Sequence, residues 1–321
     1  MRRRGLLAAA AAAPLARFWA AGAAPAWPDR PVRLIVGFAP GGPADIVARI
    51  LAEPLSEAWG QPAVVENRGG AGGNLAAQQV ARAKPDGATA LVTTSAFAVN
   101  PSLSRSAGYK PEEFVPAAVI AATPNLLAVR PDFEAKTLPE LIAYGRRKPI
   151  NFGTAGVGTT PHLSAARLLQ LQAGIDAQHV PFTGAGPALT AVLGGQIELA
   201  SVALPAAVEM VRQGALRGLV VTSAQRSPSL PEVPTAAEAG FPDVDDTTWV
   251  ALLFPAGMPA AVLGKANADT RHALASEVVR RRLAATGFDP VGLDLNASAE
   301  FVRRETERWG AVIRRLGVTL E

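Results

Sequence analysis

The chain has 321 residues, of which 49% are hydrophobic, as expected for a soluble globular protein of about two domains. Its formal net charge of +4 would suggest a nucleic-acid partner if the charge belonged to the folded protein. The absence of cysteine excludes disulfides, a thiolate nucleophile and a cysteine-ligated zinc.

Residues 1–26 have the pattern of an export signal. Three arginines at 2–4 precede an apolar run, and small residues end at Ala26. The "RRGLL" stretch resembles a twin-arginine signal; a general secretory signal and a retained signal anchor are the alternatives. We expect a cleaved signal and a periplasmic protein. Four of the 31 basic residues and no acid lie in this segment, so the remaining chain, with 27 acids, has no net charge. Neither nucleic acid nor an anionic membrane is therefore expected as a partner.

The next residues alternate between buried strands and amphipathic helices, which indicates the α/β class with a mostly parallel sheet. Apolar runs rich in Val, Ile and Leu predict strands at 32–38, 63–67, 89–94, 125–130, 150–154, 197–203, 216–223 and 249–254. Helical spacing predicts helices at 43–59, 74–83, 137–147, 161–172, 185–194 and 205–213, and a mainly helical part at 259–315. Pro54 should kink or split the first helix. Long loops are expected at 100–114 and 222–246.

The first strand leads into a glycine turn, "GFAPGGPAD" at 37–45. Pro43 suits a first helical position, because the N–H that proline lacks would have no partner there. The backbone N–H groups of Gly41, Gly42, Ala44 and Asp45 are then predicted to lie at the positive end of a helix dipole, a setting for an anion. The spacing is not that of a nucleotide fingerprint. Asp45 either holds the turn in shape or contacts the ligand.

A second turn, "FGTAGVGTTPHL" at 152–163, repeats the arrangement, with Thr160 as the predicted N-cap. Two such turns in two α/β units are expected to face one ligand. His162 either contacts that ligand or caps the helix. The glycines of a third turn, at 66–81, are interpreted as close backbone packing.

Catalytic and metal-binding patterns are missing from the sequence. His162, His179 and His272 lack a second ligand at metal spacing, and there is neither H-E-x-x-H nor G-x-S-x-G. An acid pair in catalysis stays possible from sequence alone. We expect no cofactor, no metal and no enzymatic activity.

With these residues in view, the chain closely resembles the Bug family, the extracytoplasmic substrate-binding proteins of tripartite tricarboxylate transporters. The resemblance covers nearly everything after residue 26. It is carried by "WPDRPVRLIVGFAPGGPADIVAR", "GQPAVVENRGGAGGNLAAQQVARAKPDG", "FGTAGVGTTPHL", "HVPFTGAGPALTAVLGGQIEL" and "LPEVPTAAEAGFPDV", in the family's order.

The resemblance implies a type II-like periplasmic-binding-protein fold, with two α/β domains and a ligand cleft between them. "NLLAVRP" and "TTWVALLFP" would be the two crossover segments. Domain one would then comprise 27–124 plus 248–321, and domain two would comprise 125–247.

The resemblance also implies which residues bind a carboxylate. The first turn would supply Phe38, Ala39, Pro40, Gly41, Gly42 and Asp45, and the second Thr154, Ala155, Gly156, Gly158, Thr159, Thr160 and His162. Thr94, Ser95, Thr183 and Gly184 are weaker candidates for the wall of the site, since a core or turn role is equally compatible with each.

The expected function is capture of a small organic carboxylate by a monomeric protein and delivery to the permease subunits of a tripartite transporter. Val202 and Ala203 stand where many relatives have an acidic or amide residue, and Ala166 stands where the helix often has Glu, which disfavours an amino acid as ligand. Two alternatives remain: an exported hydrolase or isomerase acting on a carboxylate, and a binding protein coupled to a sensor.

Overall fold

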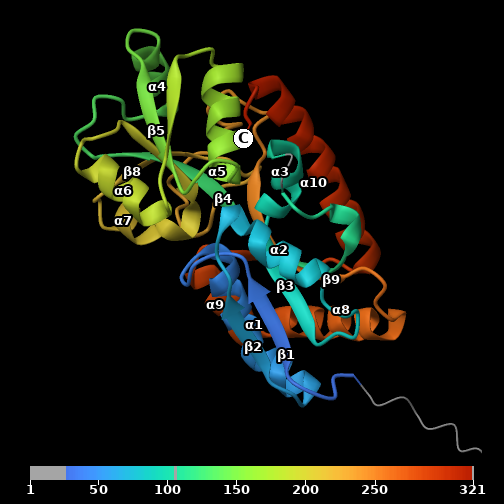
Figure 1. Cartoon of the computed structure of the whole chain (residues 1–321). Coiled ribbons are helices and arrows are strands. Elements are labelled where there is room, and N and C mark those ends of the chain that lie inside the picture. Colours follow the sequence, from blue (N-terminus) through green and yellow to red (C-terminus); the bar gives the residue numbers. More distant parts are fainter. Residues whose placement is uncertain (1–26, 105–106, 320–321) are drawn as a thin grey trace, which may run out of the picture.

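Strands and helices alternate along the chain and build two α/β lobes. In Figure 1 the first is blue to cyan together with orange and red, and the second is green to yellow. The computed structural model describes residues 27–104 and 107–319. The predicted export signal at 1–26 lies outside the described residues.

The first lobe contains the elements before β4 and those after β9. Its strand β1 pairs in parallel with β2 and β3, and β3 pairs antiparallel with β9. Its strands are β1 (Val32–Val36), β2 (Ala63–Asn67), β3 (Thr89–Thr94) and the short β10 (Asp289–Pro290). Its helices are α1 (Pro43–Trp59), α2 (Asn74–Ala81), α3 (Ala96–Leu103), α8 (Ala260–Ala275), α9 (Glu277–Ala285) and α10 (Leu295–Leu316), with short 3-10 helices η1 (Ala71–Gly73) and η2 (Pro111–Glu113).

The second lobe lies between β4 and β9 in the chain. Its strand β5 pairs in parallel with β6 and β7. Its strands are β5 (Ile150–Thr154), β6 (Ala177–Pro181), β7 (Leu199–Ala203) and β8 (Arg217–Val221). Its helices are α4 (Leu138–Gly145), α5 (Thr160–Ala166), the π-helix η3 (Arg167–Gln172), α6 (Ala185–Leu193), the 3-10 helix η4 (Leu204–Ala206) and α7 (Val208–Arg212).

Two long antiparallel strands connect the lobes. β4 (Phe114–Val129) pairs with β9 (Thr247–Pro255) in one lobe and with β7 and β8 in the other. The strand order is β2-β1-β3-β9-β4-β7-β5-β6. The sheet is therefore mixed, and the prediction of a mostly parallel sheet was wrong. A run of apolar residues indicates a buried strand, but it does not show whether that strand runs parallel or antiparallel to its neighbours.

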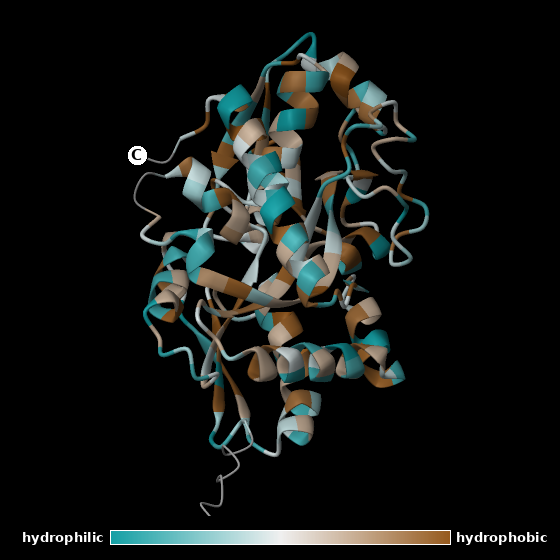
Figure 2. Ribbon diagram, turned by 90° about the vertical axis from the view of Figure 1, so that its right-hand side faces the viewer, coloured by the Kyte–Doolittle hydropathy of each residue, from teal (hydrophilic) through white to brown (hydrophobic). Residues whose placement is uncertain are grey.

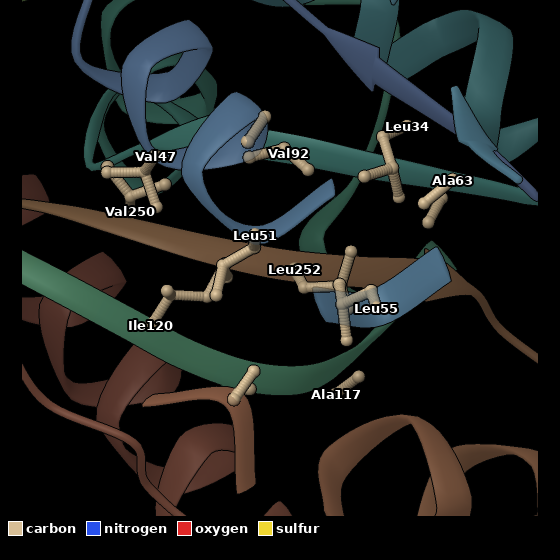
Figure 3. Packing of buried hydrophobic residues seen from close by; sticks show 14 of the residues in the cluster. Leu34, Val47, Leu51, Leu55, Ala63, Val92, Ala117, Ile120, Val250 and Leu252 are labelled. Carbon is tan, nitrogen blue, oxygen red and sulfur yellow. The ribbon is translucent and has the colours of Figure 1, made fainter. Parts of the chain in front are cut away.

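The core of the first lobe forms where α1 packs on the sheet. Leu51 and Leu55 of this helix are 1% exposed and lie against the strands that carry Ile120 and Leu252 (Figure 3). Each such side chain contributes about 1.5–3 kcal/mol by leaving water. This packing sets the direction of α1 and hence the position of its N-terminal turn.

The last helix, α10, spans both lobes (Figure 1). Trp309 and Ile313 form one buried cluster with residues of α3 in the first lobe and with Leu163 of α5 in the second. Figure 2 shows hydrophilic residues along the outer faces of the helices and hydrophobic residues in the strands. No helix in the described parts of the chain is both long and apolar enough to span a membrane.

Several element predictions need correction. Pro54 lies inside an unbroken α1, near its C-terminal end, where packing of Leu51 and Leu55 offsets the lost hydrogen bond. The predicted loop at 100–114 contains the end of α3, the 3-10 helix η2 and the start of β4. Strand β4 begins at Phe114 rather than at 125, and β6 is an additional strand. The domain limits at 124/125 and 247/248 stay a prediction.

Candidate functional site

A cavity of about 380 Å³ lies where the two lobes meet. Its walls are the segments after β1, β5, β6 and β7, together with the end of β3 and the start of β9. In open α/β sheets the crevice outside the carboxyl ends of the strands is the usual place for a ligand. The topology therefore brings the predicted turns of both lobes to one cavity.

The first glycine turn is tied down by Asp45. Its Oδ2 accepts hydrogen bonds from the Gly41 N–H at 2.8 Å and from Arg49 Nε at 3.0 Å, and its Oδ1 accepts from Asn67 Nδ2 at 2.9 Å. Burial raises the pKa of Asp45, but these hydrogen bonds outweigh burial, and the pKa lies below its ordinary value. Asp45 is only 3% exposed, and its carboxylate holds the turn in shape through these hydrogen bonds.

The same turn offers fewer free donors than predicted. Pro43 begins the helix as expected, after the N-cap Gly42. The Gly41 N–H is taken by Asp45, and the Gly42 N–H donates to the Ala39 carbonyl at 3.3 Å. The N–H groups of Ala44 and Asp45 have no hydrogen-bond partner in the described parts of the chain. They belong to the first helical turn, whose N–H groups point out of the N-terminal end.

The second glycine turn is held by side chains beneath it. The N-cap is Thr159, not Thr160: the Thr159 hydroxyl oxygen accepts from the His162 N–H at 3.4 Å and donates to the Gly156 carbonyl at 2.9 Å. The helix starts one residue earlier than predicted because Pro161 sits at its second position. The hydroxyl of Thr154 accepts from the Gly156 N–H at 3.2 Å.

Two histidines are stacked below this turn. The rings of His162 and His179 lie 3.8 Å apart, beside Phe152. His162 Nδ1 accepts from the Gly158 N–H at 3.2 Å, and His179 Nε2 lies 2.7 Å from the Thr154 hydroxyl. Burial lowers the pKa of His162 to about 3, with a contribution from His179, and burial lowers the pKa of His179 to about 4. Both rings are neutral at physiological pH.

A chain of hydroxyl groups crosses the junction of the lobes. Ser95 Oγ lies 2.9 Å from Thr160 Oγ1, which lies 2.7 Å from Thr248 Oγ1. Thr248 donates its only proton to Asn125 Oδ1 at 2.8 Å. Thr160 must therefore donate to Thr248, and Ser95 to Thr160. The chain joins the first lobe, the second lobe and both connecting strands.

The structure separates the predicted site residues into two groups. Those that line the cavity are Phe38, Ala39, Pro40, Gly41, Gly42, Thr94, Ala155, Thr159, Thr160, Thr183 and Gly184. Those behind the lining are Asp45, Ser95, Thr154, Gly156, Gly158 and His162, and the contacts above give all six a part in shaping the turns or joining the lobes. Which of them contact a ligand stays a prediction.

Nine further residues line the cavity. They are Pro43, Ile46, Pro161, Ala185, Gly186, Ala203, Pro205, Ala206 and Thr248. Most are apolar and carry no chemical signature in the sequence. Ala203, Pro205 and Ala206 lie at or just after the end of the strand predicted at 197–203, and Ala185 and Gly186 begin the helix predicted at 185–194, so the ends of these elements were the available signal.

The lining is uncharged. Among the described residues that face the cavity there is no Asp, Glu, Lys, Arg or His side chain, and the polar side chains are five threonines. The hydroxyl groups of Thr159, Thr160 and Thr248 already donate hydrogen bonds to acceptors within the protein. Those of Thr94 and Thr183 donate none in the described structure. The groups that this lining offers to a ligand are backbone groups, hydroxyls and apolar surface.

A mixed α/β fold with two lobes, two connecting strands and a cavity at their junction defines a two-lobed solute-binding protein. Residues 47–318 match the model of the "Tripartite tricarboxylate transporter family receptor". The chain belongs to this family, whose solved relatives include periplasmic binding proteins.

The relatives match over nearly the whole chain. Protein BugT of Bordetella pertussis is 36% identical over 300 residues, which are 92% of each chain. A Rhodopseudomonas palustris protein solved with adipate is 35% identical, with a TM-score of 0.85 over 91% of this chain and 99% of that one. MatC of the same organism, solved with bound malate, is 36% identical, with a TM-score of 0.80 over 89% and 100% of the two chains.

Proposed function

We propose that the protein captures a small organic carboxylate in the cavity between its lobes and delivers it to the permease of a tripartite transporter. The observation that carries this proposal is the uncharged cavity with the N-terminal end of α1 at its wall. Adipate and malate in two relatives support a carboxylate as the ligand class. The protein acts as an exported monomer in the periplasm, after cleavage of residues 1–26.

The available interactions suffice for useful affinity. Charge-assisted hydrogen bonds contribute about 1.5–3 kcal/mol each. A micromolar complex needs about 8 kcal/mol net of the cost of association. The hydroxyls of Thr94 and Thr183 supply donors at the wall, the positive end of the α1 dipole lies at Gly42 and Pro43, and apolar contact with the walls adds to them.

Binding rather than catalysis fits this lining. General acid–base chemistry needs a side chain that exchanges a proton near neutral pH, within reach of the substrate. The described residues at the cavity wall include no such side chain. We therefore propose that the protein is not an enzyme.

A ligand panel tests the function. Mono-, di- and tricarboxylates are screened by thermal stabilisation, and hits are measured by calorimetry, because a ligand of the folded state raises the melting temperature by mass action. We expect a subset of carboxylates to stabilise the protein. Failure of every carboxylate, or turnover of a bound one, would contradict the proposal.

Two glycine variants locate the binding. Gly41 and Gly60 both have positive φ, 82° and 62°, and open space where a Cβ would stand. They flank the same helix, but only Gly41 lines the cavity. Gly41→Ala should weaken carboxylate binding, and Gly60→Ala, with a similar backbone cost, should leave it unchanged.

A further inference from the structure

One ion pair connects the two lobes. Among the described residues, Arg308 and Asp246 form the only ion pair whose members belong to different lobes. Arg308 lies on α10, and Asp246 directly precedes β9, at the end of the second lobe. The Arg308 guanidinium donates to Asp246 Oδ1 and, at 2.7 Å, to the Asp245 carbonyl. The pair therefore lies where the lobes meet.

Asp246 is fixed to the second lobe. Its backbone N–H donates to the Thr222 carbonyl at 2.9 Å, and the Thr222 hydroxyl donates back to the Asp246 carbonyl. Arg167 of η3 donates to the same carboxylate oxygen as Arg308, at 2.9 Å. Because Thr222 directly follows β8, the Asp246 carboxylate moves with the strands and helices of the second lobe.

Arg308 belongs to a helix whose first half is fixed to the first lobe. The Ser298 hydroxyl oxygen accepts from the Val119 N–H at 3.1 Å, and Val302 is buried in a first-lobe core cluster. The second half of α10 meets the second lobe through apolar packing, which has no preferred direction. In the parts of the chain that the structure describes, the hydrogen bonds from α10 to the second lobe all come from Arg308.

The environment of Asp246 makes this ion pair costly to break. Its side chain is fully buried, and its Oδ2 has no hydrogen-bond partner in the described structure. The two arginines at Oδ1 therefore provide the compensation for the buried charge. Removing one partner of a buried ion pair leaves a charge that water does not reach. If Arg308 withdrew with α10, Arg167 alone would balance the carboxylate.

We propose that the Arg308–Asp246 ion pair is a clamp between the lobes, which holds them in the arrangement that forms the cavity and breaks when they separate. Lobes joined by connecting strands move relative to each other unless a large apolar interface holds them. The Ser95–Thr160 hydrogen bond, at 2.9 Å, also crosses the junction, but it is neutral and hence weaker than a charge-assisted one.

The clamp sets the balance between joined and separated lobes before any ligand binds. A ligand held by both lobes binds only the joined form, so its apparent affinity falls in proportion to the fraction of joined molecules. The clamp acts without touching the ligand, since neither Arg308 nor Asp246 lines the cavity. The proposal therefore does not depend on which ligand the protein binds.

The distance between the lobes tests the clamp. The chain has no cysteine, so Glu57→Cys on α1 and Gln213→Cys after α7, both at exposed positions, place one spin label in each lobe. Double electron–electron resonance then measures the distance distribution in the ligand-free protein. Arg308→Met removes the charge but keeps a long side chain beside Trp309, and we expect the population with separated lobes to rise about tenfold or more. Arg308→Lys restores the charge and should return most molecules to the wild-type distance.

Two controls separate the clamp from a general loosening of the structure. Arg303→Met removes the same kind of side chain from the same helix, but its partners Glu300 and Glu307 also lie on α10, so the distance should stay as in the wild type. A label pair within the second lobe, Lys136→Cys with Gln213→Cys, should give the same distribution with and without Arg308→Met.

An unchanged inter-lobe distribution in folded Arg308→Met would overturn the clamp, and so would an equal change in Arg303→Met. If Arg308→Met does not fold, Asp246→Asn takes its place, because asparagine keeps the shape and an acceptor oxygen but not the charge. A wild-type distribution in that variant would equally overturn the proposal. These measurements need no ligand, so their failure is distinct from failure of the proposed function, which the carboxylate panel decides.

Discussion

Asp45 shows how a side chain that is not in the cavity can shape it. Its carboxylate uses one hydrogen bond to fix Gly41 and others to bind Arg49 and Asn67, while Asn67 Nδ2 also reaches the Phe38 carbonyl at 3.0 Å. Both ends of the turn are thereby fixed by β2 and α1. These hydrogen bonds restrain the turn, and a restrained turn loses less conformational entropy when it binds a ligand.

Removing this carboxylate should weaken ligand binding. Asp45→Ala frees the Gly41 N–H and loosens the turn, and we expect carboxylate affinity to fall about tenfold or more by calorimetry. Arg49→Ala is the control, because Arg49 is 53% exposed and its removal leaves the Gly41–Asp45 bond in place. Equal losses of carboxylate affinity in both variants would show that the Asp45–Arg49 ion pair, rather than the geometry of the turn, controls binding.

The histidine pair could not be placed from sequence. His162 and His179 are 17 positions apart and belong to different elements, so nothing local indicated that their rings would stack. In the structure His162 Nδ1 accepts from the Gly158 N–H behind the cavity lining, and whether its ring also contacts a ligand stays a prediction. The sequence did identify the turn that the pair supports.

At the scale of elements, α10 is attached to the lobe junction by Glu305. Its Oε2 accepts from the indole N–H of Trp249 on β9 at 2.9 Å and of Trp309 at 3.1 Å. Burial raises the pKa of Glu305, and the indole hydrogen bonds oppose that effect. One side chain thus joins the last helix to a connecting strand.

Loss of this acceptor should destabilise the protein. Glu305→Ala leaves two buried indole N–H groups without a partner, and we expect a loss of about 2–5 kcal/mol in the free energy of unfolding. Glu305→Gln keeps an acceptor oxygen and should lose clearly less. Urea denaturation followed by tryptophan fluorescence measures both, and similar losses for Ala and Gln would show that the charge is what counts.

Element prediction succeeded where the hydrophobic periodicity was strong, even across Pro54 in α1, and failed where prolines interrupted a shorter or less periodic segment. The ranges predicted for α1, β2, β3 and β5 agree with the structure, because long apolar stripes and bounded runs fix them. Helix α3 contains Pro101, and β4 contains Pro116 and Pro124, so local propensity argued against both elements. The secondary structure of these two segments is therefore determined by tertiary packing rather than by local propensity.

At the scale of the whole molecule, stability should fall in mild acid. Folding lowers the pKa of His162 to about 3 and of His179 to about 4, from an ordinary value of 6.5. The unfolded chain therefore binds more protons below pH 6.5, and stability, which is complete above that pH, declines as the pH falls toward these folded values.

Two variants isolate this effect. Between pH 6.5 and 4.5 we expect the wild-type protein to lose about 2–5 kcal/mol of unfolding free energy, and the double variant His162→Asn, His179→Gln to lose much less. The carboxylates with lowered pKa, Asp45, Glu66, Glu238 and Glu300, lose their stabilising charge only at lower pH. If the unfolding free energy of the two proteins fell equally with pH, groups other than these histidines would be responsible for the loss of stability in acid.

The cavity as a whole was only half predictable. Glycine turns and threonines can be recognised in the sequence as candidate site residues, because glycine permits unusual backbone conformations and threonine provides a hydroxyl for hydrogen bonds. Of the apolar wall, Ala203 was singled out only through the family resemblance, and Pro205 and Ile46 were not singled out at all, because proline and isoleucine are common in any loop or core. Only the fold shows that Pro205 and Ile46 line the cavity.

The path of β9 has a consequence for how the chain folds. Within the sheet, β1, β2 and β3 are hydrogen-bonded to β4 only through β9, which follows the entire second lobe in sequence. The second lobe can pair its own strands early, but the first must hold an open sheet edge until residues 247–255 arrive. Until β9 arrives, a growing chain therefore leaves β3 and the first-lobe half of β4 without their β9 partner, and this interval is when a chaperone would be needed most.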